Sequence, residues 1–181
     1  MLDILGGHLD GLVWRVTLSP DGTPLVYDSI HNCGCYHLFY PTRKLCLRSA
    51  EGIFQEPPIS PQPAPPGQRP SLRIAHTSHF IDRVTRQPLI QGRAETYVWA
   101  DYQTLRSLLL ANGQRRSLFQ ANGIVPGTQR GERWILWPMG IPAPGEMRQW
   151  GHHATAFLGR RHFDDPKLME RTFEPVQGQC H

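Results

Sequence analysis

The sequence is poor in cysteine, has no long apolar run and lacks the start of an export signal. Four cysteines in 181 residues are too few to hold a protein of this size together, which excludes a disulfide-stapled scaffold. No stretch approaches the roughly 18 apolar residues of a membrane-spanning helix, and the first residues have neither a basic start nor a sustained apolar core. We therefore expect a cytoplasmic protein with no membrane partner.

The short motifs of several large enzyme classes are also absent. The chain contains no Gly-x-Ser-x-Gly nucleophile elbow, no phosphate-binding glycine-rich loop with lysine, no dinucleotide fingerprint and no His-Glu-x-x-His helix. These absences leave open whether the protein is an enzyme. A functional site has to be sought in other clusters of polar side chains.

The run from His31 to His37 carries a metal-ligating side chain at every second position, namely His31, Cys33, Cys35 and His37. Alternate side chains share one face of an extended strand. They lie roughly 6.5–7 Å apart on a straight strand, whereas two thiolates on one zinc ion are about 3.8 Å apart, so the backbone has to bend. Gly34 permits such a bend. The leading hypothesis is a metal-binding domain, with zinc as the first choice of transition metal and copper as the second.

The same run admits other interpretations. A cysteine thiolate beside a histidine is the arrangement of a nucleophilic enzyme. Otherwise the thiols are reduced within a structural turn, or Cys33 or Cys35 forms a disulfide with Cys46 or Cys180. In these last two cases the chain is a non-catalytic interaction module.

A second cluster of imidazole, guanidinium and carboxylate groups lies between residues 147 and 165. Metal-assisted hydrolysis or general acid–base chemistry would use such groups, with His152 or His153 as ligand or base and Arg148 or Arg160 as an anion clamp. The alternative is an ion-paired region in which the arginines meet neighbouring aspartates.

Hydrophobic periodicity predicts strands more often than helices. Apolar residues alternate from Leu12 to Leu18, and the Asp21-Gly22 turn that follows predicts a hairpin with a second strand from Leu25 to Ile30. Residues 94–100 and 133–137 are predicted as further strands. Because the strands do not alternate with helices, we expect an α+β fold, a mainly antiparallel sheet with two or three short helices.

The helices are expected from Asp101, from Gln114 and from Asp165, and the first two end at Asn-Gly pairs. Large apolar residues on the predicted strands and helices are expected in the core. They are Trp14, Val16, Tyr97, Trp99, Leu105, Leu109, Trp134 and Phe157.

Proline and charge bear on the domain organisation and the partners. Seven prolines lie between Pro57 and Pro70, which predicts an extended excursion at 57–70 within a single domain, 1–181. The abrupt start of the chain suits the C-terminal part of a larger polypeptide. The net charge is +4, but the basic residues are dispersed. We expect no specific nucleic-acid partner, and either a protein partner or the remainder of a larger chain.

Overall fold

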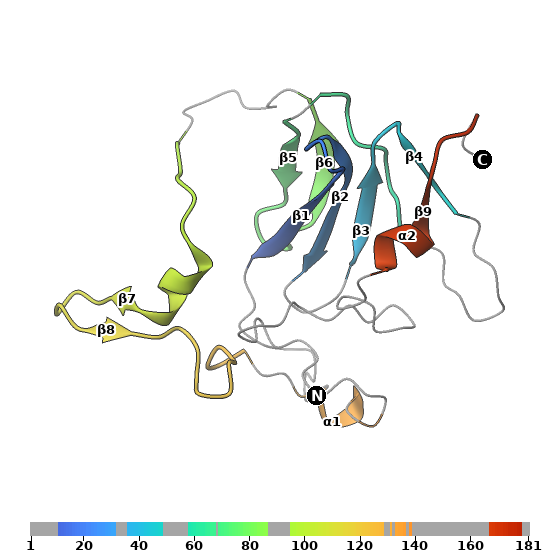
Figure 1. Ribbon diagram of the computed structural model, residues 1–181. Coiled ribbons are helices and arrows are strands. Elements are labelled where there is room, and N and C mark those ends of the chain that lie inside the picture. Colours follow the sequence, from blue (N-terminus) through green and yellow to red (C-terminus); the bar gives the residue numbers. More distant parts are fainter. Residues whose placement is uncertain are drawn as a thin grey trace.

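The computed structural model describes residues 11–31, 36–48, 58–67, 69–86, 95–128, 131, 133–136, 138 and 167–178. Most of its regular structure is short antiparallel strand (Figure 1). The strands are β1 (Leu12–Leu18), β2 (Pro24–His31), β3 (Leu38–Pro41), β4 (Leu45–Leu47), β5 (Ser71–Ile74), β6 (Ile81–Thr85), β7 (Leu108–Leu109), β8 (Arg115–Arg116) and β9 (Phe173–Pro175). The helical pieces are the 3₁₀-helix η1 (Tyr102–Arg106), α1 (Arg133–Leu136) and α2 (Leu168–Thr172).

The predicted hairpin is confirmed as β1 and β2. The two strands pair antiparallel, with Arg15 directly opposite Asp28. The turn between them is closed by the N–H of Gly22, which donates to the carbonyl of Ser19 over 2.9 Å. Gly22 has a φ of +80°, a left-handed conformation that glycine adopts without a Cβ clash. Local turn chemistry and a two-residue period were therefore sufficient to predict this part of the fold.

The central sheet has the order β1-β2-β3, and its first face is aromatic. Tyr27 and Tyr40 lie opposite each other on β2 and β3, and the Trp14 ring stacks on Tyr27 with centroids 5.6 Å apart. The β5–β6 hairpin covers this face through Val84, and Ala64 of the proline-rich excursion packs into the same cluster. The excursion is thus part of the core packing.

The proline-rich excursion also lies along the outer edge of β3. The carbonyl of Ile59 accepts the N–H of Phe39 over 2.9 Å, and the N–H of Ala64 donates to the carbonyl of Pro41 over 2.8 Å. The β3 edge of the sheet is therefore hydrogen-bonded, whereas β1 pairs with β2 alone among the described strands.

The second face of the sheet packs against the C-terminal elements. Val26 and Phe39 form a buried cluster with Phe173, and the rings of Phe39 and Phe173 meet edge to face at 5.6 Å. Leu168 and Met169 of α2 add to the cluster. Strand β9 pairs with β4, so two segments far apart in the sequence lie side by side (Figure 1).

Residues 95–117, which we call the arm, stand off from the strands of the sheet (Figure 1). Residues 95–100 have no regular secondary structure, η1 follows, and β7 and β8 form a small hairpin. Every residue of the arm except Leu105 is exposed. The prediction that residues of this region contribute to the core is therefore wrong.

The helix predicted from Asp101 begins there as the short 3₁₀-helix η1, which Asp101 caps, but it ends at Arg106 and does not continue to Asn112. The helix predicted from Gln114 is replaced by strand β8 and tight turns. The N–H of Gly113 donates to the carbonyl of Leu110, and the side chain of Asn112 accepts the N–H of Gln114. The second Asn-Gly pair repeats this pattern: the N–H of Gly123 donates to Gln120, and Asn122 accepts from Ile124. The Asn-Gly pairs are therefore turns between antiparallel segments and not helix ends.

The β-rich part of the predicted fold class is confirmed. An α+β fold with two or three helices is not, because α1 and α2 contain four and five residues, little more than one turn each. Residues 133–136, predicted as strand, are α1. Among the expected core residues, Val16, Tyr97, Trp99, Leu109 and Trp134 are exposed, and Phe157 lies outside the described residues. No helix in the described ranges is long and apolar enough to span a membrane.

The turn between β1 and β2 contains a carboxylate, Asp21, whose pKa is lowered by hydrogen bonds. The Ser19 hydroxyl and the backbone N–H of Thr23 both donate to the carboxylate of Asp21, and these bonds lower the pKa of Asp21 to about 2. Replacing Ser19 with alanine removes the larger contribution and is expected to raise the pKa of Asp21 toward the usual value of about 3.9. NMR titration of the side-chain carboxyl measures this. Ser117→Ala, which removes a serine hydroxyl elsewhere, is the control and should leave Asp21 unchanged.

Candidate functional site

The two histidines of the predicted metal run lie on opposite faces of the sheet. Because Asp28 and Phe39 are paired across β2 and β3, their side chains share the second face. His37, two residues before Phe39, lies on that face, whereas His31, three residues after Asp28, lies on the other. The chain reverses direction between these strands, so the alternate spacing of the run does not bring the two imidazoles together.

On the second face, His37 belongs to a buried ionic cluster with Asp28 and Arg15. The side chains of His37 and Asp28 are both fully buried. His37 Nε2 lies 2.8 Å from Asp28 Oδ2, and Arg15 Nε donates to the same oxygen over 2.9 Å. An ionised carboxylate only accepts, so Nε2 of His37 carries a proton. One carboxylate oxygen thus accepts hydrogen bonds from both the imidazole of His37 and the guanidinium of Arg15.

Burial and hydrogen bonding act on Asp28 in opposite directions. Burial alone would raise its pKa, but the hydrogen bonds from His37 and Arg15 outweigh that effect and hold the pKa of Asp28 below its usual range. The other carboxylate oxygen, Oδ1, is buried and has no hydrogen-bond partner in the described part of the chain. Asp28 and His37 are therefore buried in the interior, while Arg15, whose side chain is 27% exposed, lies at the surface end of the cluster.

On the first face, His31 belongs to an aromatic cluster. Its ring lies 5.2 Å from that of Tyr36 and 5.0 Å from that of Phe80, while Tyr36 and Phe80 meet edge to face at 4.4 Å. Burial and the nearby His79 lower the pKa of His31. These ring contacts fix His31 against the β5–β6 hairpin and away from the buried carboxylate.

The predicted metal-binding function is wrong. Among the residues that the structure describes, no group of three or more His, Cys, Asp or Glu side chains is arranged to hold a metal ion. His31 and His37 are separated by the sheet and occupied by other contacts, as set out above. Cys33 and Cys35 lie outside the described residues. A zinc or other metal site in this run therefore has no support.

Cys46 of β4 is disulfide-bonded. The chain's other cysteines, Cys33, Cys35 and Cys180, lie outside the described residues. A disulfide at Cys46 is therefore present, and its pairing with Cys33 or Cys35 stays a prediction. The proposed catalytic residues His152, His153, Arg148 and Arg160 also lie outside the described part of the chain.

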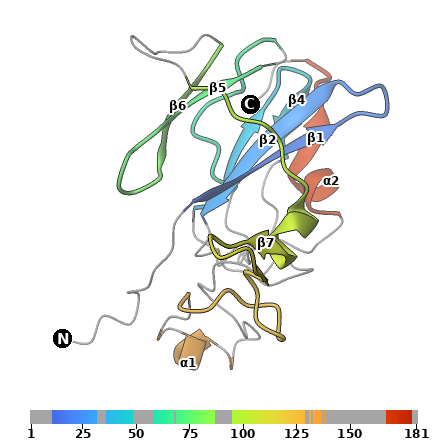
Figure 2. The ribbon, with the colours of Figure 1, turned by 90° about the vertical axis from the view of Figure 1, so that its left-hand side faces the viewer.

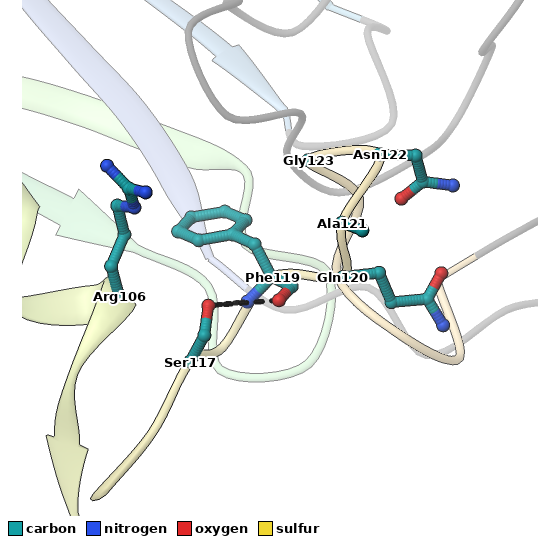
Figure 3. Close-up of a pocket in the computed structure, with 7 residues that line it drawn as sticks. All are labelled: Arg106, Ser117, Phe119, Gln120, Ala121, Asn122 and Gly123. Atoms are coloured by element: carbon teal, nitrogen blue, oxygen red, sulfur yellow. Dashed lines mark hydrogen bonds between the residues drawn. The ribbon is translucent and has the colours of Figure 1, made fainter.

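A hollow of about 430 Å³ lies at the loop that follows β8 (Figure 3). The Ser117 hydroxyl in its wall is bonded to the backbone of Phe119 in both directions, as donor over 2.9 Å and as acceptor over 3.0 Å. Figure 3 shows the amides of Gln120 and Asn122 on the opposite side of Phe119 from Arg106. Because these polar groups do not converge on one point, the hollow lacks the usual arrangement of a small-molecule site.

The most unusual surface of the described structure is the segment Tyr97-Val98-Trp99 at the start of the arm. The three residues are 80%, 89% and 92% exposed. The rings of Tyr97 and Trp99 meet edge to face at 6.0 Å, on one side of the extended chain. Sequence analysis marked these residues as important but assigned them to the core. The signal was their β-rich, aromatic pattern, which is the same for a core strand and for a strand that pairs with another molecule.

Comparison with protein-family models, with curated proteins and with solved structures finds no match to this chain. The class of protein therefore has to be inferred from its own surfaces and interior.

Proposed function

We propose that this chain is a protein-binding domain, and that its binding element is the extended segment 95–101. The observation that carries the proposal is the exposure of three consecutive large apolar residues, Tyr97, Val98 and Trp99. Fully burying one such side chain is worth about 1.5–3 kcal/mol. None of this free energy is gained in the isolated chain, and all of it is available to a complex.

The mode of binding that suits the segment is addition of a strand to a sheet edge. Residues 95–100 have no regular secondary structure and are all exposed. Their valine, threonine and aromatic residues are enriched in strands. A segment that adds to an open edge gains main-chain hydrogen bonds, while alternate side chains provide the specificity. Tyr97 and Trp99 are the side chains that would contact the partner and determine the specificity of binding.

The buried ionic cluster supports a structural role for the sheet. His37 and Asp28 have no exposed surface, so they are better suited to fix β1, β2 and β3 than to meet a substrate. The disulfide at Cys46 bears on the compartment. Structural disulfides are rare in the reducing cytosol, and we infer an oxidising environment in place of the cytoplasmic one that we expected.

A double substitution in the arm tests the proposed function. Tyr97→Ser with Trp99→Ser is expected to change the free energy of unfolding of the monomeric chain, measured at a concentration too low for association, by no more than about 0.5 kcal/mol, because exposed residues contribute little to it. The same change should abolish photo-crosslinking of the full chain to its partner from a benzoylphenylalanine at position 98. Urea unfolding gives the first quantity, and mass spectrometry of the crosslinked product identifies the partner.

Gln103 is the matched control position for the crosslinker, since it lies in the same arm and is exposed. Equal crosslinking from positions 98 and 103 would count against the proposal. A decrease of several kcal/mol in the free energy of unfolding of the monomeric double variant would also overturn it, because such a decrease is typical of removing buried side chains from a core. Crosslinks to nucleic acid that weaken steeply with salt would instead show that the aromatic rings stack on bases.

A further inference from the structure

We propose that the receiving edge is strand β1 of a second copy of this chain, and that two copies exchange their arms reciprocally. This inference rests on the proposed function, because it names the partner of the same segment. Among the described residues β1 pairs only with β2, so its other edge has no strand beside it. The opposite edge of the sheet, β3, is hydrogen-bonded to the proline-rich excursion. As far as the described strands go, the sheet thus offers one open edge, that of β1.

The side chains of β1 mark the same edge. Val16 and Leu18 of β1 are 43% and 52% exposed, although they follow Trp14 on the aromatic face of the sheet. An exposed apolar edge strand is a template for pairing with another chain. Aromatic and β-branched residues are favourable cross-strand neighbours. Tyr97 and Trp99 would cover Val16 and Leu18 and extend the row of rings formed by Trp14 and Tyr27.

The length and the charge of segment 95–101 also suit its pairing with strand β1. Segment 95–101 and strand β1 each contain seven residues, or about 23 Å of extended chain. Glu95 and Asp101 make the segment acidic at both ends, whereas the chain as a whole carries +4. The segment is therefore attracted to the basic chain that carries β1.

The position of the arm favours a second copy over its own sheet. Figure 2 looks from the side of the arm, and residues 95–100 pass in front of β1 and β2, while Figure 1 shows them standing off from these strands. All six residues are exposed, so they do not cover their own β1. Four aromatic rings at about 150–250 Å² each bring a reciprocal exchange to about 600–1,000 Å². The valines, Leu18 and the backbone add to this, which approaches the roughly 1,200 Å² of a stable interface.

The test measures the association of the full chain by analytical ultracentrifugation. The wild-type chain is expected to be a dimer. Trp99→Ser in the segment and Val16→Lys on the edge are each expected to raise the dimer Kd at least about tenfold. Ile74→Lys is the control, because Ile74 is 44% exposed on β5 and receives the same new charge away from the β1 edge. It should leave the dimer intact.

Mixing the two variants gives the sharpest result. The Val16→Lys chain keeps an intact segment and the Trp99→Ser chain keeps an intact β1, so only the mixture contains one complete contact. Heterodimers in the mixture, with monomers in each variant alone, are the expected outcome. A monomeric wild-type chain would overturn the proposal that the partner is a second copy, and so would a dimer whose Kd is unchanged by Val16→Lys. Crosslinking from position 98 to a different protein in either case would show that the proposed function holds with another partner.

Discussion

Replacing Asp28 with alanine is expected to lower the free energy of unfolding by about 3–5 kcal/mol, the usual cost of removing one partner from a buried ion pair. The reason is the geometry of the cluster. His37 Nε2 and Arg15 Nε both donate to one oxygen of Asp28, and the variant leaves these donors in the interior without an acceptor. Urea or guanidinium unfolding measures the difference.

Asp82 provides the matched control. It pairs with Arg73 at 3.7 Å, but both side chains are exposed. Exposed pairs contribute about 0–1 kcal/mol, so Asp82→Ala should have a small effect. Equal destabilisation by the two alanine variants would show that the Asp28 cluster is not a buried ion pair in solution.

The effect of Asp28→Ala should depend on pH. The pKa of Asp28 is lowered in the folded chain, so its contribution to stability is complete above the unfolded value of about 3.9. It is lost as the pH falls through the folded pKa, where the carboxylate takes up a proton. The difference in free energy of unfolding between the wild-type chain and the variant is therefore expected to be constant near neutral pH and to decrease only at acidic pH.

Replacing Cys46 with serine is expected to cost about 2–4 kcal/mol, the typical contribution of a native disulfide. Strand β4 is otherwise held by its pairing with the three-residue strand β9, by the packing of Leu45 and by hydrogen bonds of Arg48 to the backbone of the C-terminal elements. The ion pair of Arg48 with Glu174, at 3.2 Å, is exposed at both ends. Unfolding with and without a reductant measures the contribution: the wild-type chain should lose stability on reduction, and Cys46→Ser should not respond.

Thiol counting gives an independent check on the disulfide. The unfolded wild-type chain without reductant should show two fewer reactive thiols than the reduced chain. Four reactive thiols in both states, with unchanged stability on reduction, would contradict a disulfide at Cys46.

The part of the fold that could be predicted from sequence is the part decided by neighbouring residues. The β1–β2 hairpin follows from alternating apolar residues and one Asp-Gly turn. Its register even places Arg15 opposite Asp28, so a charged residue inside the apolar strand β2 was a sign of a cross-strand ion pair. That sign was overlooked in favour of the more conspicuous histidines and cysteines.

The arm could not be predicted because its patterns have two structural meanings. Gly113 and Gly123 have φ values of +81° and +83°, and a glycine in this conformation ends a helix as readily as it closes a turn between strands. Periodic leucines and aromatic residues likewise indicate that a surface is to be buried, but not against which partner. Tyr97 and Trp99 were placed in the core for this reason.

The metal hypothesis failed for a related reason. Alternation puts side chains on one face only while the strand continues. His31 ends β2, and His37 precedes β3 on the return path. The sequence gives no sign of where the chain reverses, so ligands that are neighbours in sequence were separated by the thickness of the sheet.

The hydrogen bonds that the proline-rich excursion makes to β3 limit how far this sheet can grow. With Ile59 and Ala64 bonded along that edge, β1 is the side of the described sheet on which another strand can be added. Sheets that are open on both sides propagate into fibres, whereas closed two-fold exchange stops at a pair. In the proposed exchange of arms the excursion would therefore prevent polymerisation, and shortening it is expected to give aggregation that increases with concentration.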